Sequence, residues 1–103
     1  MNTSLITFLS CLPFLIYAQD IDSLKVRGIV NFNMKYYHIA LDKFSLALEI
    51  EPQKDLFLYR GMTHQELLNY DEALKDYSKV IDLDRSGVNG YYKRGYVNYL
   101  KKD

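Results

Sequence analysis

Residues 57–81 read FLYRGMTHQELLNYDEALKDYSKVI and contain two patterns of helical spacing, separated by a short break. The first pattern takes steps of three and four residues through Phe57, Gly61, His64 and Leu68. The second pattern takes the same steps through Ala73, Tyr77, Val80 and Ile81. Because such steps place side chains on one face of an α-helix, this stretch predicts two packed helices with a turn near Asn69 between them.

An Arg-Gly pair lies inside the first of these patterns, and the same pair recurs along the chain. The three copies are at residues 27–28, 60–61 and 94–95, so the step from one copy to the next is nearly constant. Glycine inside a helix costs about 1 kcal/mol relative to alanine, so three copies at a regular spacing indicate a repeated packing requirement. A fixed period of this size is typical of a solenoid. We therefore expect the glycines to mark places where helix backbones meet.

The positions that follow the Arg-Gly pairs repeat as well. With the first two Arg-Gly pairs aligned, the matched residues are Tyr37 with Tyr70, Ala40 with Ala73, Phe44 with Tyr77 and Ala47 with Val80. Small Gly61 and Ala73 would let the two helices of a unit approach closely, with Tyr77 filling the space beside them. Pro52 is expected to close the first unit because proline cannot continue a helix. Asp71 is expected to cap the second helix of the next unit.

These residues resemble the tetratricopeptide repeat family, whose pattern is thirty-four residues long. In the first unit the pattern positions are Leu24, Gly28, Tyr37, Ala40, Phe44, Ala47 and Pro52. In the second unit they are Phe57, Gly61, Tyr70, Ala73, Tyr77, Val80 and Arg85, the last departing from the expected proline. A third unit begins with Tyr91 and Gly95. The resemblance covers about residues 21–103, and the subtype with arginine before the glycine fits all three units.

The resemblance implies an all-α fold, a solenoid of helix-turn-helix repeats that winds as a right-handed superhelix. The expected units are residues 21–53, residues 54–87 and a partial repeat at residues 88–103. The stem of each paired arginine can pack while its guanidinium meets water or an acid on the second helix, such as Asp76. His64 takes an inter-helix packing position and is expected to be a buried or half-buried spacer.

The charge balance argues against nucleic-acid binding, and the motifs argue against catalysis and cofactor binding. Thirteen basic and thirteen acidic residues balance, whereas binding to phosphate backbones needs a basic excess. His38 and His64 lie in different units and share no metal-ligand spacing with other residues. The acids of DLD, residues 82–84, lack the further ligands of a calcium loop, and no phosphate loop or nucleophile motif is present. We therefore expect no catalytic, cofactor or metal site.

In the family that the sequence resembles, the first helix of each unit lines a concave groove that binds partners. Carried over to this sequence, the groove consists of Lys25, Ile29, Phe32, Asn33, Leu58, Met62, Gln65, Glu66, Asn89, Tyr92, Tyr96 and Tyr99, with Asp22, Asp55 and Leu100 beside them. This surface is acidic at one edge and aromatic toward the C-terminus, which suits an extended peptide or a partner helix. The alternative is that its aromatic members only pack on the next helix. A clamp for a peptide carboxylate is not expected, because Ile29 and Tyr59 replace two asparagines of such a clamp.

Residues 1–18, MNTSLITFLSCLPFLIYA, differ from the rest because they carry no charged side chain. The apolar run that ends at Ala18 has roughly the length of a signal-peptide core and is too short for a spanning helix. We predict a signal peptide that is cleaved before Gln19, although no Lys or Arg precedes the apolar run. An uncleaved membrane anchor and an ordinary apolar first helix are the alternatives. Cys11 is the only cysteine, so no intrachain disulfide can form.

Together these observations predict an exported protein-interaction module, periplasmic or secreted, with a membrane-anchored form as the alternative. The expected partner is a protein or peptide and not a nucleic acid, while membrane association and self-association through the C-terminal helix are left open. That helix has apolar and aromatic residues on more than one side, so we expect another helix to cover part of it. The rival interpretation is an architectural or input segment of a longer receptor or membrane-associated assembly.

If residues 1–18 are a signal peptide, the protein purified from its native host begins at or near Gln19, because Ala18 is the small residue that precedes the cut. Intact-mass measurement and N-terminal sequencing check this expectation. A soluble cytoplasmic protein that retains Met1 would contradict export.

Overall fold

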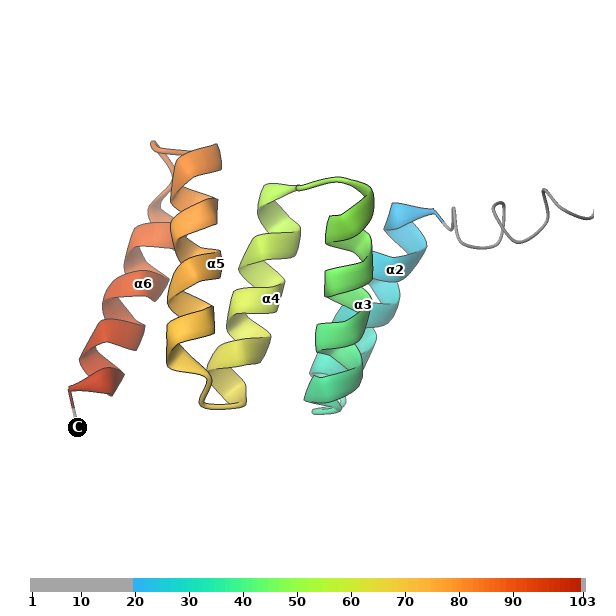
Figure 1. Cartoon of the computed structure of the whole chain (residues 1–103), viewed down its shortest axis with the longest axis horizontal. Coiled ribbons are helices and arrows are strands. Elements are labelled where there is room, and N and C mark those ends of the chain that lie inside the picture. Colours follow the sequence, from blue (N-terminus) through green and yellow to red (C-terminus); the bar gives the residue numbers. More distant parts are fainter. Residues whose placement is uncertain (1–19, 103) are drawn as a thin grey trace, which may run out of the picture.

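The computed structural model describes residues 20–102, which form five α-helices and, within that range, no strand. The helices are α2 (Ile21–Asn33), α3 (Tyr37–Ile50), α4 (Lys54–Glu66), α5 (Tyr70–Leu83) and α6 (Val88–Lys101). Figure 1 shows them side by side, following one another across the molecule in chain order. The predicted signal segment, residues 1–18 with Cys11, lies outside the described residues.

Helices that are neighbours in the chain pack together, and the most extensive contacts join α2 to α3 and α4 to α5. The first helix of each pair also contacts the pair before it, since α4 packs on α3 and α6 packs on α5. The three first helices begin at Ile21, Lys54 and Val88, so their starts recur at the same spacing as the Arg-Gly pairs. The architecture is an all-α helical-repeat solenoid, which confirms the predicted fold class.

Two turns of the same shape join the paired helices. Lys35 and Leu68, which occupy the same position in successive units, have φ angles of 65° and 64°. In the first turn the Tyr36 N–H then donates to the Asn31 carbonyl oxygen at 2.8 Å, and the equivalent bond recurs in the second turn at 2.8 Å. A left-handed residue at the end of a helix is most often glycine. Here a lysine and a leucine adopt this conformation. The sequence therefore predicts that the helix ends here, but not that a left-handed residue ends it.

One expected helix cap is wrong. Asp71 does not cap α5, because the helix begins at Tyr70 and its N-cap residue is Asn69, which makes no side-chain cap bond. Asp71 therefore lies in the first turn, where its negative charge favours the positive end of the helix. Its carboxylate accepts a hydrogen bond from Lys101 of α6, which links the two helices and lowers the pKa of Asp71.

The hydrophobic core consists of two clusters that follow the repeat. The first contains Leu24, Ala40, Phe44, Ala47 and Leu56, and the second contains Ala73, Tyr77 and Val97. Each cluster is completed by a residue from the first helix of the following unit, namely Leu56 of α4 and Val97 of α6, both of which have no exposed surface. Each helix pair thus depends on the next helix to bury its core, as neighbouring units of a solenoid do.

The glycines of the first two Arg-Gly pairs lie at close helix contacts, as predicted. A Cβ atom built on Gly28 would collide with the ring of Phe44, and one built on Gly61 would lie 2.6 Å from the Tyr77 ring. The third glycine differs, because a Cβ atom on Gly95 would meet nothing within 4 Å. The glycine of the Arg-Gly pair therefore lies at a tight helix contact on α2 and α4, but faces open space on α6.

This difference predicts opposite effects of one substitution at two matched sites. Gly61→Leu should lower the free energy of unfolding by about 1–3 kcal/mol, because the new side chain must displace a buried ring. Gly95→Leu should cause no loss and should gain up to about 1 kcal/mol, because leucine is the better helix former. Urea melts measure both changes, and the exposed Lys79→Ala variant, expected within about 0.5 kcal/mol of wild type, is the control. Equal effects at Gly61 and Gly95 would show that the contact is misassigned.

Candidate functional site

The predicted groove residues lie on α2, α4 and α6, the first helices of the three units. One hollow is lined by residues of both α4 and α6. Leu58 of α4 and Asn89 of α6 both line a small hollow between the units. Its other lining residues are Lys54, Val80, Asp84, Gly87, Val88 and Gly90. At its edge the Lys54 ammonium pairs with the Asp84 carboxylate at 2.8 Å, and this bond, with one from Ser86, lowers the pKa of Asp84. The structure thus brings groove residues of neighbouring units together between α4 and α6.

At the α2 end of the predicted groove, Lys25 is paired with groups of the protein itself. Its ammonium donates to the Asp55 carboxylate at 2.7 Å and to the Gln53 side-chain oxygen at 3.0 Å. Only 20% of the Lys25 side chain is exposed. The charge of this lysine is therefore balanced by the neighbouring unit, and the pair ties α2 to α4 instead of presenting a cation to a ligand.

Several other groove residues also serve the core. Ile29 and Phe32 pack against the first core cluster, and Leu58 and Met62 pack against the second. Gln65 accepts a hydrogen bond from the hydroxyl of Tyr77 at 2.8 Å. These five side chains therefore pack, at least in part, against their own fold, as the alternative interpretation of the groove expects.

The remaining groove residues are exposed, and three of them are tyrosines on one face of α6. Asn33, Glu66 and Asn89 are exposed polar residues. Tyr92, Tyr96 and Tyr99 expose 69%, 45% and 66% of their surface, and the rings of the last two are stacked with centroids 6.4 Å apart. We call these three residues the tyrosine strip. They share one face of α6 because they follow steps of four and three residues.

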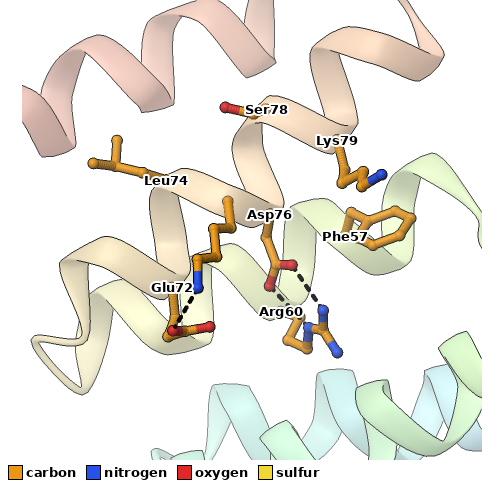
Figure 2. Close-up of a pocket in the computed structure, with 8 residues that line it drawn as sticks. Phe57, Arg60, Glu72, Leu74, Asp76, Ser78 and Lys79 are labelled. Carbon is orange, nitrogen blue, oxygen red and sulfur yellow. Dashed lines mark hydrogen bonds and ion pairs between the residues drawn. The ribbon is translucent and has the colours of Figure 1, made fainter.

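A second hollow lies beside the ion pair of Arg60 with Asp76 (Figure 2). The Arg60 Nε and Nη2 atoms donate to the two carboxylate oxygens of Asp76, each at 2.8 Å. Only 5% of the Asp76 side chain is exposed, and the hydrogen bond with this carboxylate raises the pKa of Arg60. The pair confirms the prediction that a paired arginine meets an acid on the second helix. The hollow itself was not predicted, and in Figure 2 its residues Leu74 and Ser78 point away from the ion pair.

The matching arginine of the first unit has no such partner. Arg27 corresponds to Arg60 in the repeat register, and the residue that corresponds to Asp76 is Lys43. Within residues 20–102, no carboxylate pairs with Arg27. The fork of two hydrogen bonds is therefore specific to the α4–α5 pair.

His64 packs between α4 and α5 as a half-buried residue, which agrees with its predicted role as a spacer. Its Nδ1 atom is buried and has no hydrogen-bond partner among the described residues. Burial lowers the pKa of His64, and the Arg60 charge lowers it further, while the Asp76 and Glu72 carboxylates act in the opposite direction. The part of the chain that the structure describes holds no group of three or more potential metal ligands, and none of its helices is long and apolar enough to cross a membrane.

The lowered pKa of His64 predicts a loss of stability in mild acid. Below the ordinary value of 6.5 the unfolded chain takes up a proton that the folded chain resists, so the free energy of unfolding falls as the pH drops below that value. His64→Asn, which introduces the residue found at the matching positions 31 and 98, should reduce this dependence. Urea melts between about pH 7.5 and about pH 5 test it, with the exposed His38→Asn variant as control. An unchanged pH dependence in His64→Asn would contradict the assignment.

Comparison with known proteins agrees with this fold. Residues 69–102, which comprise α5 and α6, match the TPR repeat family. The chain is 30% identical over 81 residues to small glutamine-rich tetratricopeptide repeat-containing protein 2 of Saccharomyces cerevisiae, covering 78% of this chain and 23% of that protein. It is 30% identical over 78 residues to human serine/threonine-protein phosphatase 5, covering 75% and 16% of the two chains.

A third relative is the protein SGT1 homolog of Oryza sativa subsp. japonica, which is 30% identical over 79 residues and covers 76% of this chain and 21% of that protein. The chain thus spans less than a quarter of the length of each of these relatives. Residues 69–102 thus match a tetratricopeptide repeat, and the chain, which folds as a helical-repeat solenoid, is similar in sequence to a segment of each of these longer proteins.

Proposed function

We propose that this chain is a non-catalytic protein-interaction module that binds an extended peptide or a partner helix in the groove lined by α2, α4 and α6. The match to a tetratricopeptide repeat and the similarity to a protein named for such repeats support the interaction class. The observation that carries the proposal is the tyrosine strip, a surface of three exposed aromatic rings on one face of α6.

The strip has the properties of an anchor for a ligand. Tyrosine is enriched among the residues that contribute most to protein interfaces, because its ring offers a large apolar area and its hydroxyl can form a hydrogen bond. Tyr96 and Tyr99 are already held against each other by stacking. A ligand therefore meets a partly ordered surface and orders fewer side chains when it binds.

The hollow that Leu58 and Asn89 line offers further contacts to a ligand in the proposed groove. Leu58 offers an apolar side chain there, and Asn89 offers an amide that can bond to a peptide backbone. At the α2 end the ligand would find no free ammonium on Lys25, because Asp55 and Gln53 hold it. We therefore expect the ligand to be recognised by apolar or aromatic side chains and not by a carboxylate held at Lys25.

A peptide library displayed on phage and selected on the full chain tests this function. Selected peptides are then titrated against the wild type, Tyr92→Ala and Tyr96→Ala. Loss of one ring should weaken binding about tenfold, the typical effect of removing an interface anchor. Tyr36→Ala is the matched control, since this tyrosine is 53% exposed and precedes α3.

Two outcomes would contradict peptide binding in the proposed groove. The first is that no peptide binds more tightly to the wild type than to the Tyr92→Ala/Tyr96→Ala double variant. The second is that Tyr36→Ala weakens binding as much as either substitution in the tyrosine strip.

A further inference from the structure

Glu66 is a carboxylate of the predicted groove whose charge is not balanced by a neighbouring side chain. It is exposed and is the last residue of α4. Among residues 20–102, no cation pairs with it, whereas Asp55 of the same groove set is paired with Lys25. The helix α4 packs on α3 and on α5, so the exposure of Glu66 is a property of the middle of the solenoid.

The position of Glu66 at the end of its helix makes this charge more unfavourable. The C-terminal end of a helix carries a partial negative charge, which favours a cation and opposes a carboxylate. The basic residue in the last turn of α4 is His64, whose pKa is lowered by burial, so at neutral pH it offers no compensating charge. The carboxylate and the helix end therefore make this part of the groove attractive to a cation.

Tyr37 lies beside this carboxylate, and Phe32 packs against Tyr37. Tyr37 is the first residue of α3, and Figure 1 shows the start of α3 at the same edge of the molecule as the end of α4. Partial burial raises the pKa of Tyr37, and the charge of the Glu66 carboxylate and a hydrogen bond to it raise this pKa further. The rings of Phe32 and Tyr37 meet edge-on, with centroids 5.5 Å apart. We call Glu66, Tyr37 and Phe32 the Glu66 subsite.

A carboxylate beside an aromatic ring has the chemistry that binds a basic side chain. The carboxylate forms charge-assisted hydrogen bonds with an ammonium or guanidinium group, and the face of an aromatic ring attracts a cation. A carboxylate has about four acceptor positions, so the hydrogen bond from Tyr37 leaves room on Glu66 for a ligand. Arginine fits best, because its planar guanidinium can stack on a ring while it donates to a carboxylate.

The charges of the groove favour a basic ligand over an acidic one. The groove set contains three acids and a single lysine, Lys25. That lysine is held by Asp55, and Lys101 at the end of α6 is held by Asp71. Because complementary charges across an interface favour association and like charges oppose it, a carboxylate on the ligand would be repelled near Glu66.

We propose that the groove ligand carries a basic side chain, preferably arginine, which binds at the Glu66 subsite. Its cation pairs with the Glu66 carboxylate, and its stem and charged group pack on the aromatic rings. This inference rests on the proposed groove function and deepens it, because it adds a charge requirement to recognition by the tyrosine strip. Phe32 and Tyr99 occupy the same position in their units, so the subsite and the strip belong to one groove.

A small arginine derivative tests the subsite without any assumption about the rest of the ligand. N-acetyl-arginine N-methylamide is titrated into the full chain, and NMR spectra follow the signals of Glu66, Tyr37 and Phe32. We expect saturable shifts at these three residues, which weaken as salt is added because salt screens exposed charges. The citrulline derivative has nearly the same shape but no charge. It should bind about fivefold more weakly, the factor that a good exposed ion pair contributes.

Glu66→Gln removes the charge and keeps the shape of the side chain, so it should weaken binding of the arginine derivative about fivefold. The fold should stay intact in urea melts, because Glu66 is exposed and its charge opposes the helix end. Glu49→Gln is the matched control. Glu49 is also exposed in the last turn of its helix, α3, and pairs with no cation in residues 20–102. This variant should bind as the wild type does.

Selection of the phage library on Glu66→Gln beside the wild type connects the subsite to the groove. Peptides selected on the wild type should be enriched in arginine or lysine. This enrichment should be lost on Glu66→Gln, while the dependence of binding on Tyr92 persists. A pool that requires Tyr92 without basic enrichment would overturn this inference and leave groove binding intact. If no peptide is selected but the arginine derivative binds at Glu66, the groove function is contradicted and the cation site stands.

Two further results would overturn the proposal. One is the absence of saturable shifts at Glu66, Tyr37 and Phe32 in the titration with the arginine derivative. The other is an equal affinity for the arginine and citrulline derivatives, or for the wild type and Glu66→Gln, because the charge of Glu66 would then play no part in binding.

Discussion

An aromatic ring that lies over a glycine is the contact on which the rest of this solenoid depends. Phe44 covers Gly28, and Tyr77 covers Gly61, in each case with no exposed surface on the ring residue. Burial of such a ring contributes roughly 1.5–3 kcal/mol, which exceeds the cost of about 1 kcal/mol for glycine in a helix. A Cβ atom at either glycine would lie within 3 Å of the ring, so the ring or the helix would have to shift.

The same rings carry the packing from one unit to the next. Phe44 stacks on Tyr59 of α4 with ring centroids 5.6 Å apart, and Tyr77 shares its cluster with Val97 of α6. Burial raises the pKa of Tyr77, and the nearby Asp76 and Glu66 carboxylates raise it further. Its hydroxyl therefore stays protonated and donates to the Gln65 side-chain oxygen. A core residue thus occupies one hydrogen-bond acceptor of a predicted groove residue.

The three first helices consequently offer very different surfaces to a ligand. On α2 and α4 many groove side chains are already committed to the core or to each other, as in the pairing of Lys25 with Asp55. On α6 the tyrosine strip remains exposed. The exposed aromatic residues of the predicted groove therefore all lie on α6.

The sequence by itself determined the class of fold, because helical steps of three and four residues and the regular return of the Arg-Gly pair can be read without knowledge of any contact. It also located the helix contacts at Gly28 and Gly61 and the acid that meets Arg60, but the expected contact at Gly95 is absent. It misplaced the cap of α5 and did not reveal the left-handed Lys35 and Leu68, because glycine is the usual sign of that conformation and neither turn carries one there. Only the tertiary structure decided which groove side chains are free. Lys25 lies on α2, whereas Gln53 and Asp55 lie at the start of α4. Whether the ammonium group meets a ligand or a neighbouring carboxylate depends on how closely these two helices approach.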